Sequence, residues 1–240
     1  MGWHREPLIG FDLETTGTDP REARIVTAAV IEVREGEPAG HRQWMADPGV
    51  EIPADAVAVH GISNERAAAE GRPADQVADA VADVLTGYWK TGVPVVAYNA
   101  SFDLTLLAAE LRRHGLPSLS ERLGGAAPGP VVDPYTIDRW ADRYRRGKRT
   151  LEAVCTEYGV VLDAAHDASA DALAAARLAC AIAVRHPKVA ALGPAELHRR
   201  QIEWYAAWAA DFQDFLRRKG DPAAVVDGTW PLRAPADERV

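Results

Sequence analysis

The most constraining feature of this chain is the segment at residues 9–17, Ile-Gly-Phe-Asp-Leu-Glu-Thr-Thr-Gly, which joins an apolar run to two acids. The apolar residues 7–11 predict a buried strand, and Asp12 and Glu14 follow two positions apart. Side chains at this spacing point to the same face of a strand. Both carboxylates can therefore bind one hard cation such as Mg2+, although the segment alone also fits a solvated strand end.

The chain has 240 residues and a formal net charge of -8 at pH 7. This length suits one domain with an appendage, or two small domains. The acidic balance argues against a protein that coats long duplexes nonspecifically, because that function needs a broad basic surface. It is compatible with a nucleic-acid enzyme, since bound divalent cations reverse the local field of carboxylates that bind them.

The apolar stretches of the chain, such as 93–97 and 172–184, are too short or too interrupted by charge to cross a bilayer. The first seven residues lack the basic and apolar regions of a signal peptide. We therefore expect a cytoplasmic protein with no membrane partner. Cys155 and Cys180 lie far apart in helical patterns and outside any Cys-x-x-Cys motif, which predicts two buried thiols.

Hydrophobic patterning predicts an antiparallel meander followed by alternating strands and helices, which indicates an α/β fold with a mixed sheet. The strand at 24–33 is rich in β-branched residues, and a turn at 36–40 leads to a third strand at 41–46. Further strands are expected at 93–97 and 131–133. Helices are expected from Ser63 to 70, after Pro73, and over 104–114, 135–145, 150–158, 169–185 and 194–219.

Two further segments place titratable side chains near helix starts. Asp103 follows the strand at 93–97, and His166 precedes Asp171 by five positions. Hydrolysis of a phosphodiester with two metals needs carboxylates that hold the cations about 3.5–4 Å apart and a base for the attacking water. A neutral histidine can be that base near neutral pH. Each residue taken singly also fits a helix-start acid or a surface loop histidine, so the combination carries the interpretation.

The three motifs together resemble those of the DEDDh 3′–5′ exonucleases, which include the proofreading subunit of the bacterial replicative polymerase, ribonuclease T and oligoribonuclease. They are Asp12-x-Glu14 followed by Thr15-Thr16-Gly17, Asn99-x-x-Phe102-Asp103, and His166-x-x-x-x-Asp171. The resemblance covers about residues 7–185, and His60-Gly61-Ile62 is similar to the family's loop between the first two motifs. It implies a ribonuclease H-like fold with an exonuclease domain at 1–186, followed by a C-terminal helix and an irregular tail at 187–240.

The same resemblance implies two divalent cations, Mg2+ or Mn2+, held by Asp12, Glu14, Asp103 and Asp171, with His166 as general base. It also implies a set of residues that bind the 3′-terminal nucleotide: Leu13, Thr15, Thr16, His60, Asn99 and Phe102. Many relatives have a histidine before the asparagine of the second motif, whereas Tyr98 stands here. This departure leaves the expected metal ligands intact and concerns the substrate contacts.

The motifs predict a metal-dependent 3′–5′ exonuclease that releases nucleoside 5′-monophosphates from the 3′ end of single-stranded DNA, in proofreading or repair. An exoribonuclease that trims RNA 3′ ends or short oligoribonucleotides fits the same motifs, because ribose choice depends on contacts to one 2′-hydroxyl. An alternative of another class is a catalytically silent nucleic-acid-binding module that accompanies a polymerase. Such a module has no need of all five catalytic-type residues.

Residues 139–149 hold six basic side chains against one acid, Asp142, which gives a local charge of +5 (six minus one). This cluster fits either a patch that follows the phosphates behind the scissile end or a solvated helix face. The candidate phosphate contacts are Arg143, Arg145, Arg146, Lys148 and Arg149.

The helix expected at 194–219 carries an aromatic stripe made of Ile202, Tyr205, Trp208, Phe212, Phe215 and Leu216. Such a stripe fits packing against the body of the protein. It also fits a docking surface for a polymerase, a clamp or a second copy of the chain, because exposed aromatic patches mark interfaces.

Overall fold

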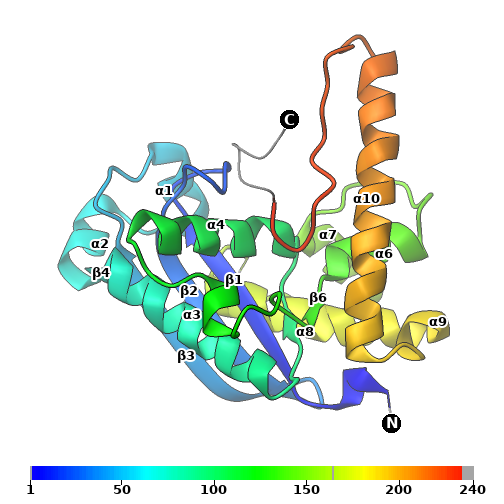
Figure 1. The fold of residues 1–240 in the computed structure, drawn as a ribbon, viewed down its shortest axis with the longest axis horizontal. Coiled ribbons are helices and arrows are strands. Elements are labelled where there is room, and N and C mark those ends of the chain that lie inside the picture. Colours follow the sequence, from blue (N-terminus) through cyan, green and yellow to red (C-terminus); the bar gives the residue numbers. More distant parts are fainter. Residues whose placement is uncertain (1, 164, 234–240) are drawn as a thin grey trace.

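A six-stranded mixed sheet forms the centre of the computed structural model, which describes residues 2–163 and 165–233 (Figure 1). The strand order is β4-β3-β2-β1-β5-β6. Antiparallel pairing joins β1 (Leu8–Thr15), β2 (Ile25–Arg34) and β3 (Glu37–Asp47). Parallel pairing adds β5 (Val95–Val96) next to β1, β6 (Val131–Val132) next to β5, and β4 (Arg72–Pro73) next to β3. The predicted mixed sheet with an antiparallel meander is confirmed.

The hairpin between β2 and β3 is tighter than the sequence suggested. Its turn consists of Glu35 and Gly36, which have φ values of 53° and 82°, and two-residue turns with positive φ match the twist of the strands they join. The predicted start of the third strand at residue 41 was therefore wrong, since β3 begins at Glu37 and includes Pro38. Pro38 is tolerated because β4 pairs with β3 only at Ala46 and Asp47, which leaves an open edge beside the proline.

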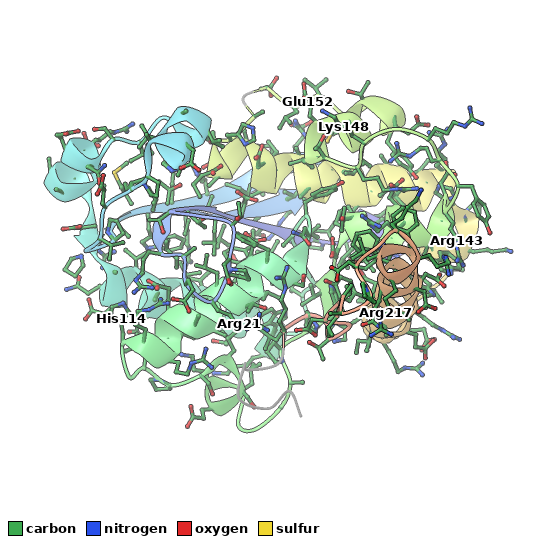
Figure 2. All side chains as sticks on the ribbon, turned by 90° about the horizontal axis from the view of Figure 1, so that it is seen from above. Arg21, His114, Arg143, Lys148, Glu152 and Arg217 are labelled. Atoms are coloured by element: carbon green, nitrogen blue, oxygen red, sulfur yellow. The ribbon has the colours of Figure 1, made fainter. Side chains whose placement is uncertain are left out.

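Helices cover both faces of the sheet, and Figure 2 shows the sheet edge-on between them. On one face, α3 (Ala74–Lys90) and α4 (Ala100–Arg113) pack on Ile9, Phe11 and Leu13 of β1. On the other face, α8 (Ala168–Arg185) packs on β1 and β2, and α6 (Pro134–Ala141) and α7 (Leu151–Tyr158) pack against α8. The short helices are η1 (Trp3–Arg5), α1 (Ala54–His60), α2 (Asn64–Glu70), α5 (Leu119–Arg122) and α9 (Pro187–Ala190).

Most helix predictions are confirmed, and the differences lie at the ends. Ser63 caps α2, accepting a hydrogen bond from Arg66 N. The α4 helix begins at Ala100 instead of residue 104, because Asn99 adopts a left-handed conformation (φ 62°) that starts the helix directly after β5. The α6 helix ends at Ala141 instead of residue 145, and 142–150 form a loop. The helices α1, α5 and α9 were not predicted; they are at most two turns long, which is too short for a helical period to stand out.

Gly10 allows α8 to lie directly on β1. A Cβ atom at Gly10 would stand 2.3 Å from the carbonyl oxygen of Ala172, a distance that no side chain tolerates. Alanines dominate the buried face of α8, which keeps the helix close to the strand. Because Asp171 precedes Ala172, this approach also fixes the distance between Asp171 and the acids of β1.

Replacing Gly10 with alanine is expected to lower the free energy of unfolding by about 1–3 kcal/mol, the usual cost of forcing extra atoms into a packed core. The matched control is Gly87→Ala on α3, where nothing lies within 4 Å of the new Cβ and better helix propensity stabilises by about 1 kcal/mol. Denaturant unfolding of both variants measures the difference. Equal stability of Gly10→Ala and the wild type would contradict the close packing of α8 on β1.

The C-terminal helix α10 (Pro194–Arg218) completes the edge of the sheet. His198 Nδ1 accepts a hydrogen bond from Val131 N (3.1 Å), and Gln201 Nε2 donates to Val131 O (2.9 Å). Gln201 Oε1 accepts from Asp133 N at 2.7 Å. These side chains satisfy backbone groups that an exposed edge strand would leave unpaired.

Residues 187–233 therefore pack on the same core as the predicted exonuclease domain at 1–186. Tyr205 of α10 and Trp230 of the tail both belong to the main core cluster, and Figure 1 shows the tail returning from the far end of α10 toward the sheet. Phe212 and Phe215 stay exposed, so only part of the aromatic stripe packs on the body. Residues 234–240 of the predicted irregular tail lie outside the described residues.

Both cysteines are free thiols; Cys155 is buried, and Cys180 is half-buried. In the described ranges, no helix combines the length and the apolar character that crossing a membrane requires.

Candidate active site

Two of the three sequence motifs meet where α8 begins against β1. Leu8 packs with residues of α8, and Gly10 lies against Ala172 of the same helix. Because side chains alternate along a strand, Asp12 and Glu14 also point to the face of the sheet that α8 covers. Asp171 stands in the first turn of α8. One ligand atom from each of Glu14, His166 and Asp171 lies within 4.8 Å of the others.

The second motif supplies Asp103 from the first turn of α4, which follows β5. Asp103 is buried, and its Oδ1 accepts a hydrogen bond from Leu13 N at 3.1 Å. This bond ties the start of α4 to β1 between the two acids of the first motif. The negative charges of Asp103, Asp171 and Glu14 all act on Asp12, so the four predicted metal ligands form one cluster.

The acids of this cluster hold protons more tightly than ordinary carboxyls. Burial is the main cause, and it raises the pKa of Glu14 to about 7 and that of Asp171 to about 6. Burial also raises the pKa of Asp12, and repulsion from its acidic neighbours adds to the effect. The pKa of Asp103 is raised by burial as well, although the hydrogen bond from Leu13 opposes this shift.

The cluster fits divalent cations. Asp171 Oδ1 is buried and lacks a hydrogen-bond partner among the described atoms, and an unpaired buried oxygen of this kind is costly without a positive partner. Carboxylate oxygens are the ligands that Mg2+ and Mn2+ prefer. The four acids therefore have the donor chemistry and the charge that two such cations require.

His166 lies in an exposed loop immediately before α8, with a left-handed backbone conformation (φ 66°). Its backbone N donates to Asp171 Oδ2 at 3.3 Å. Asp167 joins this loop to α8 by capping the helix, and a 2.9 Å contact between Ser169 Oγ and His41 Nε2 holds the first turn of α8. The sequence did not indicate this contact of His41, because a polar residue on an exposed strand is common.

The predicted nucleotide-binding residues of the first motif use their side chains locally. Leu13 packs in the core, so only its backbone faces the acids. Thr15 Oγ1 donates to Gly17 O (2.8 Å), and Thr16 Oγ1 accepts from Arg24 N (2.9 Å). These bonds shape the turn after β1.

The remaining predicted nucleotide contacts border the cluster from two sides. His60 ends α1, and its Nδ1 accepts a hydrogen bond from Ile62 N at 3.1 Å. Burial is the main cause that lowers the pKa of His60, and the nearby His166 adds to the effect. Asn99 donates its backbone N–H to Asp133 Oδ1 (2.9 Å). Phe102 is half-buried and packs against the core. Their roles in binding a nucleotide stay predictions.

Tyr98, the departure from the family pattern, connects the second motif to the loop at 142–150. Its hydroxyl donates to Arg149 O at 2.7 Å, and its ring packs edge-to-face on Tyr135 with centroids 5.5 Å apart. Burial raises the pKa of this phenol, so the hydroxyl stays a donor. Tyr98 therefore has a structural role that a histidine of different reach would not reproduce.

The structure gives carboxylate partners to three of the five candidate phosphate contacts. Buried Asp138 pairs with both Arg145 (2.8 Å) and Arg149, and Arg143 pairs with Asp211 (2.5 Å). Arg146 and Lys148 are exposed, and neither has an ion pair within residues 2–163 and 165–233. Carboxylates of the protein therefore engage Arg143, Arg145 and Arg149, and the role of all five residues in binding phosphates stays a prediction.

Lys148 borders a groove of about 520 Å³ that leads to the acid cluster. The groove lies between the loop at 142–150, the start of α7 and the loop that carries His166. Figure 2 shows Lys148 beside Glu152 of α7. A chain that leaves the acid cluster through this groove passes the ammonium group of Lys148.

Comparison with known proteins agrees with this geometry. Residues 9–179 match the family described as Exonuclease (RNase_T). The PolC-type DNA polymerase III of Streptococcus thermophilus is 29% identical over 171 residues, which are 71% of this chain and 11% of that protein. The PolC-type enzyme of Halalkalibacterium halodurans is 27% identical over 173 residues, with the same shares covered. This chain thus matches only about a tenth of these relatives.

Solved structures share the fold. The zinc-bound complex of Escherichia coli Exonuclease I with single-stranded DNA superposes with a TM-score of 0.64 and 21% identity, over 76% of this chain and 42% of that one. Exonuclease I of Methylocaldum szegediense gives a TM-score of 0.59 and 25% identity, over 76% and 41%. These matches confirm the predicted ribonuclease H-like fold.

The mixed sheet and the acid cluster at the end of β1 define a nuclease of the DnaQ-like class. Since the family match covers most of the chain, this protein belongs to the DEDD exonuclease family.

Proposed function

We propose that this protein is a metal-dependent 3′–5′ exonuclease that removes nucleoside 5′-monophosphates from the 3′ end of single-stranded DNA. The observation that carries the proposal is the convergence of Asp12, Glu14, Asp103 and Asp171 with His166 from three separate segments. The relatives support it, because PolC-type proteins are DNA polymerases and Exonuclease I was crystallised with single-stranded DNA. A polymerase is accordingly the partner that we propose.

The residues have distinct roles in the proposed reaction. Asp12, Glu14, Asp103 and Asp171 hold two cations, which when bound activate water and stabilise the departing 3′ oxygen. His166 accepts a proton from the attacking water, and its exposed loop leaves the imidazole free to reach the scissile phosphate. His60, Asn99 and Phe102 border the acids and would position the terminal nucleotide.

One assay tests polarity and substrate together. The purified chain with Mg2+ or Mn2+ is incubated with DNA and RNA single strands of the same sequence, labelled at either the 3′ or the 5′ end. A 3′ label should appear at once as a mononucleotide, while a 5′ label should remain on a shortening ladder. Immediate release of a 5′-terminal mononucleotide would overturn the polarity, and faster shortening of RNA would overturn the choice of DNA.

Metal binding is expected to stabilise the protein more at pH 8 than at pH 5. The raised pKa values of Glu14 (about 7) and Asp171 (about 6) mean that the folded metal-free protein binds more protons than the unfolded chain. The contribution of these two groups to stability is therefore fully present below the ordinary carboxyl pKa of about 4 and is lost as pH rises through about 6 to 7. A divalent cation binds the ionised cluster without competition at pH 8 but must displace protons at pH 5.

Thermal unfolding with EDTA, Mg2+ or Mn2+ at the two pH values measures this effect. Glu14→Gln is the control variant, because it removes one charge and should reduce the metal-dependent rise in Tm at pH 8. Equal metal-dependent shifts at both pH values would contradict the assignment of the cluster as the metal site.

Replacing Arg146 and Lys148 together with alanine is expected to weaken binding of single-stranded DNA and to flatten its salt dependence. Each phosphate contact with a single strand contributes about 0.7 to the slope of log K against log salt, so the slope should fall by about 1.4. The control is Arg112→Ala, an exposed arginine toward the other end of α4. Unchanged slopes in the double variant would show that the loop does not follow the phosphates.

A further inference from the structure

A second cavity, of about 260 Å³, lies between α6 and α10 and is lined by aromatic rings and arginines. The indole of Trp140 stacks on that of Trp204, with ring centroids 4.1 Å apart and an interplanar angle of 11°. Trp204 covers one face of Trp140, yet 40% of Trp140 remains exposed. Two tryptophans from separate helices thus present a flat aromatic surface at the rim of the cavity.

Several contacts hold Arg139, one of the arginines that line this cavity. The guanidinium of Arg139 lies between two rings, 4.4 Å from the centroid of Tyr135 and 4.3 Å from that of Trp208. It also donates to the Tyr135 hydroxyl at 2.5 Å. Stacked rings and sandwiched guanidinium groups lose little conformational freedom when a flat ligand binds, since they are already ordered.

The loop at 142–150 links this cavity to the active-site groove. Arg143 borders the aromatic cavity, whereas Arg145 and Lys148 border the groove that contains His166 and Asp171. Tyr144 stands between them and is 87% exposed. In Figure 2, Lys148 lies near α7, and Arg143 lies farther along the same loop toward α10.

The loop that spans the two cavities is held in place from below. Arg145 and Arg149 both pair with buried Asp138, and Arg149 also donates to Asp142 O at 2.5 Å. These contacts hold the loop in place beneath its exposed side chains. Its exposed cations, Arg146 and Lys148, give it a positive charge that stands out on a chain of net charge -8.

We propose that Trp140 is a base-stacking site for single-stranded nucleic acid, upstream of the nucleotide that occupies the active site. Aromatic rings flanked by cations bind single strands because every base has a π-face and every nucleotide a phosphate. The phosphates would follow Lys148 and Arg146 across the loop, and a base would stack on the exposed part of Trp140. This inference rests on the proposed function, since it takes the groove as the place where the 3′ end enters.

The test measures binding without hydrolysis. Asp12→Asn serves as the background, and fluorescence anisotropy reports the binding of 5′-labelled oligothymidylates of about 4 and about 12 nucleotides in Mg2+. Adding Trp140→Leu should weaken binding of the longer oligonucleotide by about tenfold, the loss of affinity expected for one stacked base. Binding of the shorter oligonucleotide should be unaffected. Trp140→Phe should restore most of the loss, which also excludes a folding defect as the cause.

Phe215→Leu is the control, because Phe215 is 45% exposed on the far part of α10. It should bind both lengths like the background protein. Equal weakening of both lengths by Trp140→Leu, or no weakening, would overturn the stacking site. A change in solution mass without a change in DNA binding would also overturn it and would identify the surface as a self-association interface.

The two proposals fail in distinguishable ways. If the wild-type protein degrades no nucleic acid but the length-dependent effect of Trp140→Leu persists, the proposed function fails and the stacking site stands. If the wild-type protein degrades single-stranded DNA and Trp140→Leu binds both lengths normally, only the stacking site fails.

Discussion

Replacing Asp12 with asparagine is expected to lower the kcat of the proposed exonuclease by about 1000-fold or more. Asp12 lies on β1 among Asp103, Asp171 and Glu14, and the charges of all three act on it. Cation chemistry at such sites supplies several kcal/mol of transition-state stabilisation, and each 1.36 kcal/mol corresponds to a factor of ten in rate. Single-turnover release of a 3′-terminal nucleotide at saturating Mg2+ measures the loss.

The same substitution should stabilise the metal-free protein, which separates loss of function from loss of fold. Burial is the main cause that raises the pKa of Asp12, and repulsion from the neighbouring acids is the second. Asparagine is nearly isosteric with aspartate and removes one of these mutually repelling charges. The Tm in EDTA at pH 8 should therefore rise. Asp75→Asn, on the exposed first turn of α3, controls for charge and should leave kcat unchanged. A kcat for Asp12→Asn within tenfold of the wild type would contradict the central role of Asp12.

The local geometry of the first motif followed from the sequence, because strand alternation depends only on spacing. Asp12 and Glu14 were predicted on one face, and α8 packs on that face through Gly10. The glycine itself carried a readable signal, since a glycine within an apolar strand often marks the close approach of another backbone. Ala172, which lies against Gly10, directly follows the predicted metal ligand Asp171 in the chain. The close packing of α8 on β1 therefore also sets the position of Asp171.

The ion pairs of the basic cluster at 139–149 could not be predicted from local sequence. Asp138 occupies an ordinary helical position, and nothing in the pattern shows that it is buried beneath Arg145 and Arg149. Long side chains choose partners by three-dimensional proximity, which spacing along the chain does not encode. The same limit applies to Gln201 and His198, whose hydrogen bonds to the edge strand join residues about 70 positions apart.

The role of α10 was left open by the sequence for a related reason. A helical stripe of aromatic residues shows that one face is apolar but not what covers it. In the structure Tyr205 is buried, whereas Phe212 and Phe215 are exposed. Trp204 and Trp208 of α10 instead line the cavity at Trp140. The loop after Ala141 contributes Arg143 to the same cavity, and periodicity placed this end of α6 four residues too late.

Replacing His166 with alanine is expected to lower kcat by about 1000-fold, with a much smaller change in the affinity for single-stranded DNA. General-base catalysis by a positioned side chain contributes about 100- to 10,000-fold. The side chain of His166 is exposed, and the loop is held through its backbone N–H to Asp171 and through the cap by Asp167. Removing the imidazole therefore leaves these supports and the four acids in place, so binding should survive while proton transfer is lost.

Added imidazole provides the sharper measurement. Because His166 lies in an exposed loop, a free imidazole molecule can enter the space left by His166→Ala, and it should restore part of kcat with a dependence on pH that follows its own neutral form. His114→Ala, at the end of α4, is the control and should show neither the loss nor the rescue. If His166→Ala instead raises KM with kcat unchanged, or if imidazole has no effect while the Tm is that of the wild type, His166 positions the substrate and another group accepts the proton.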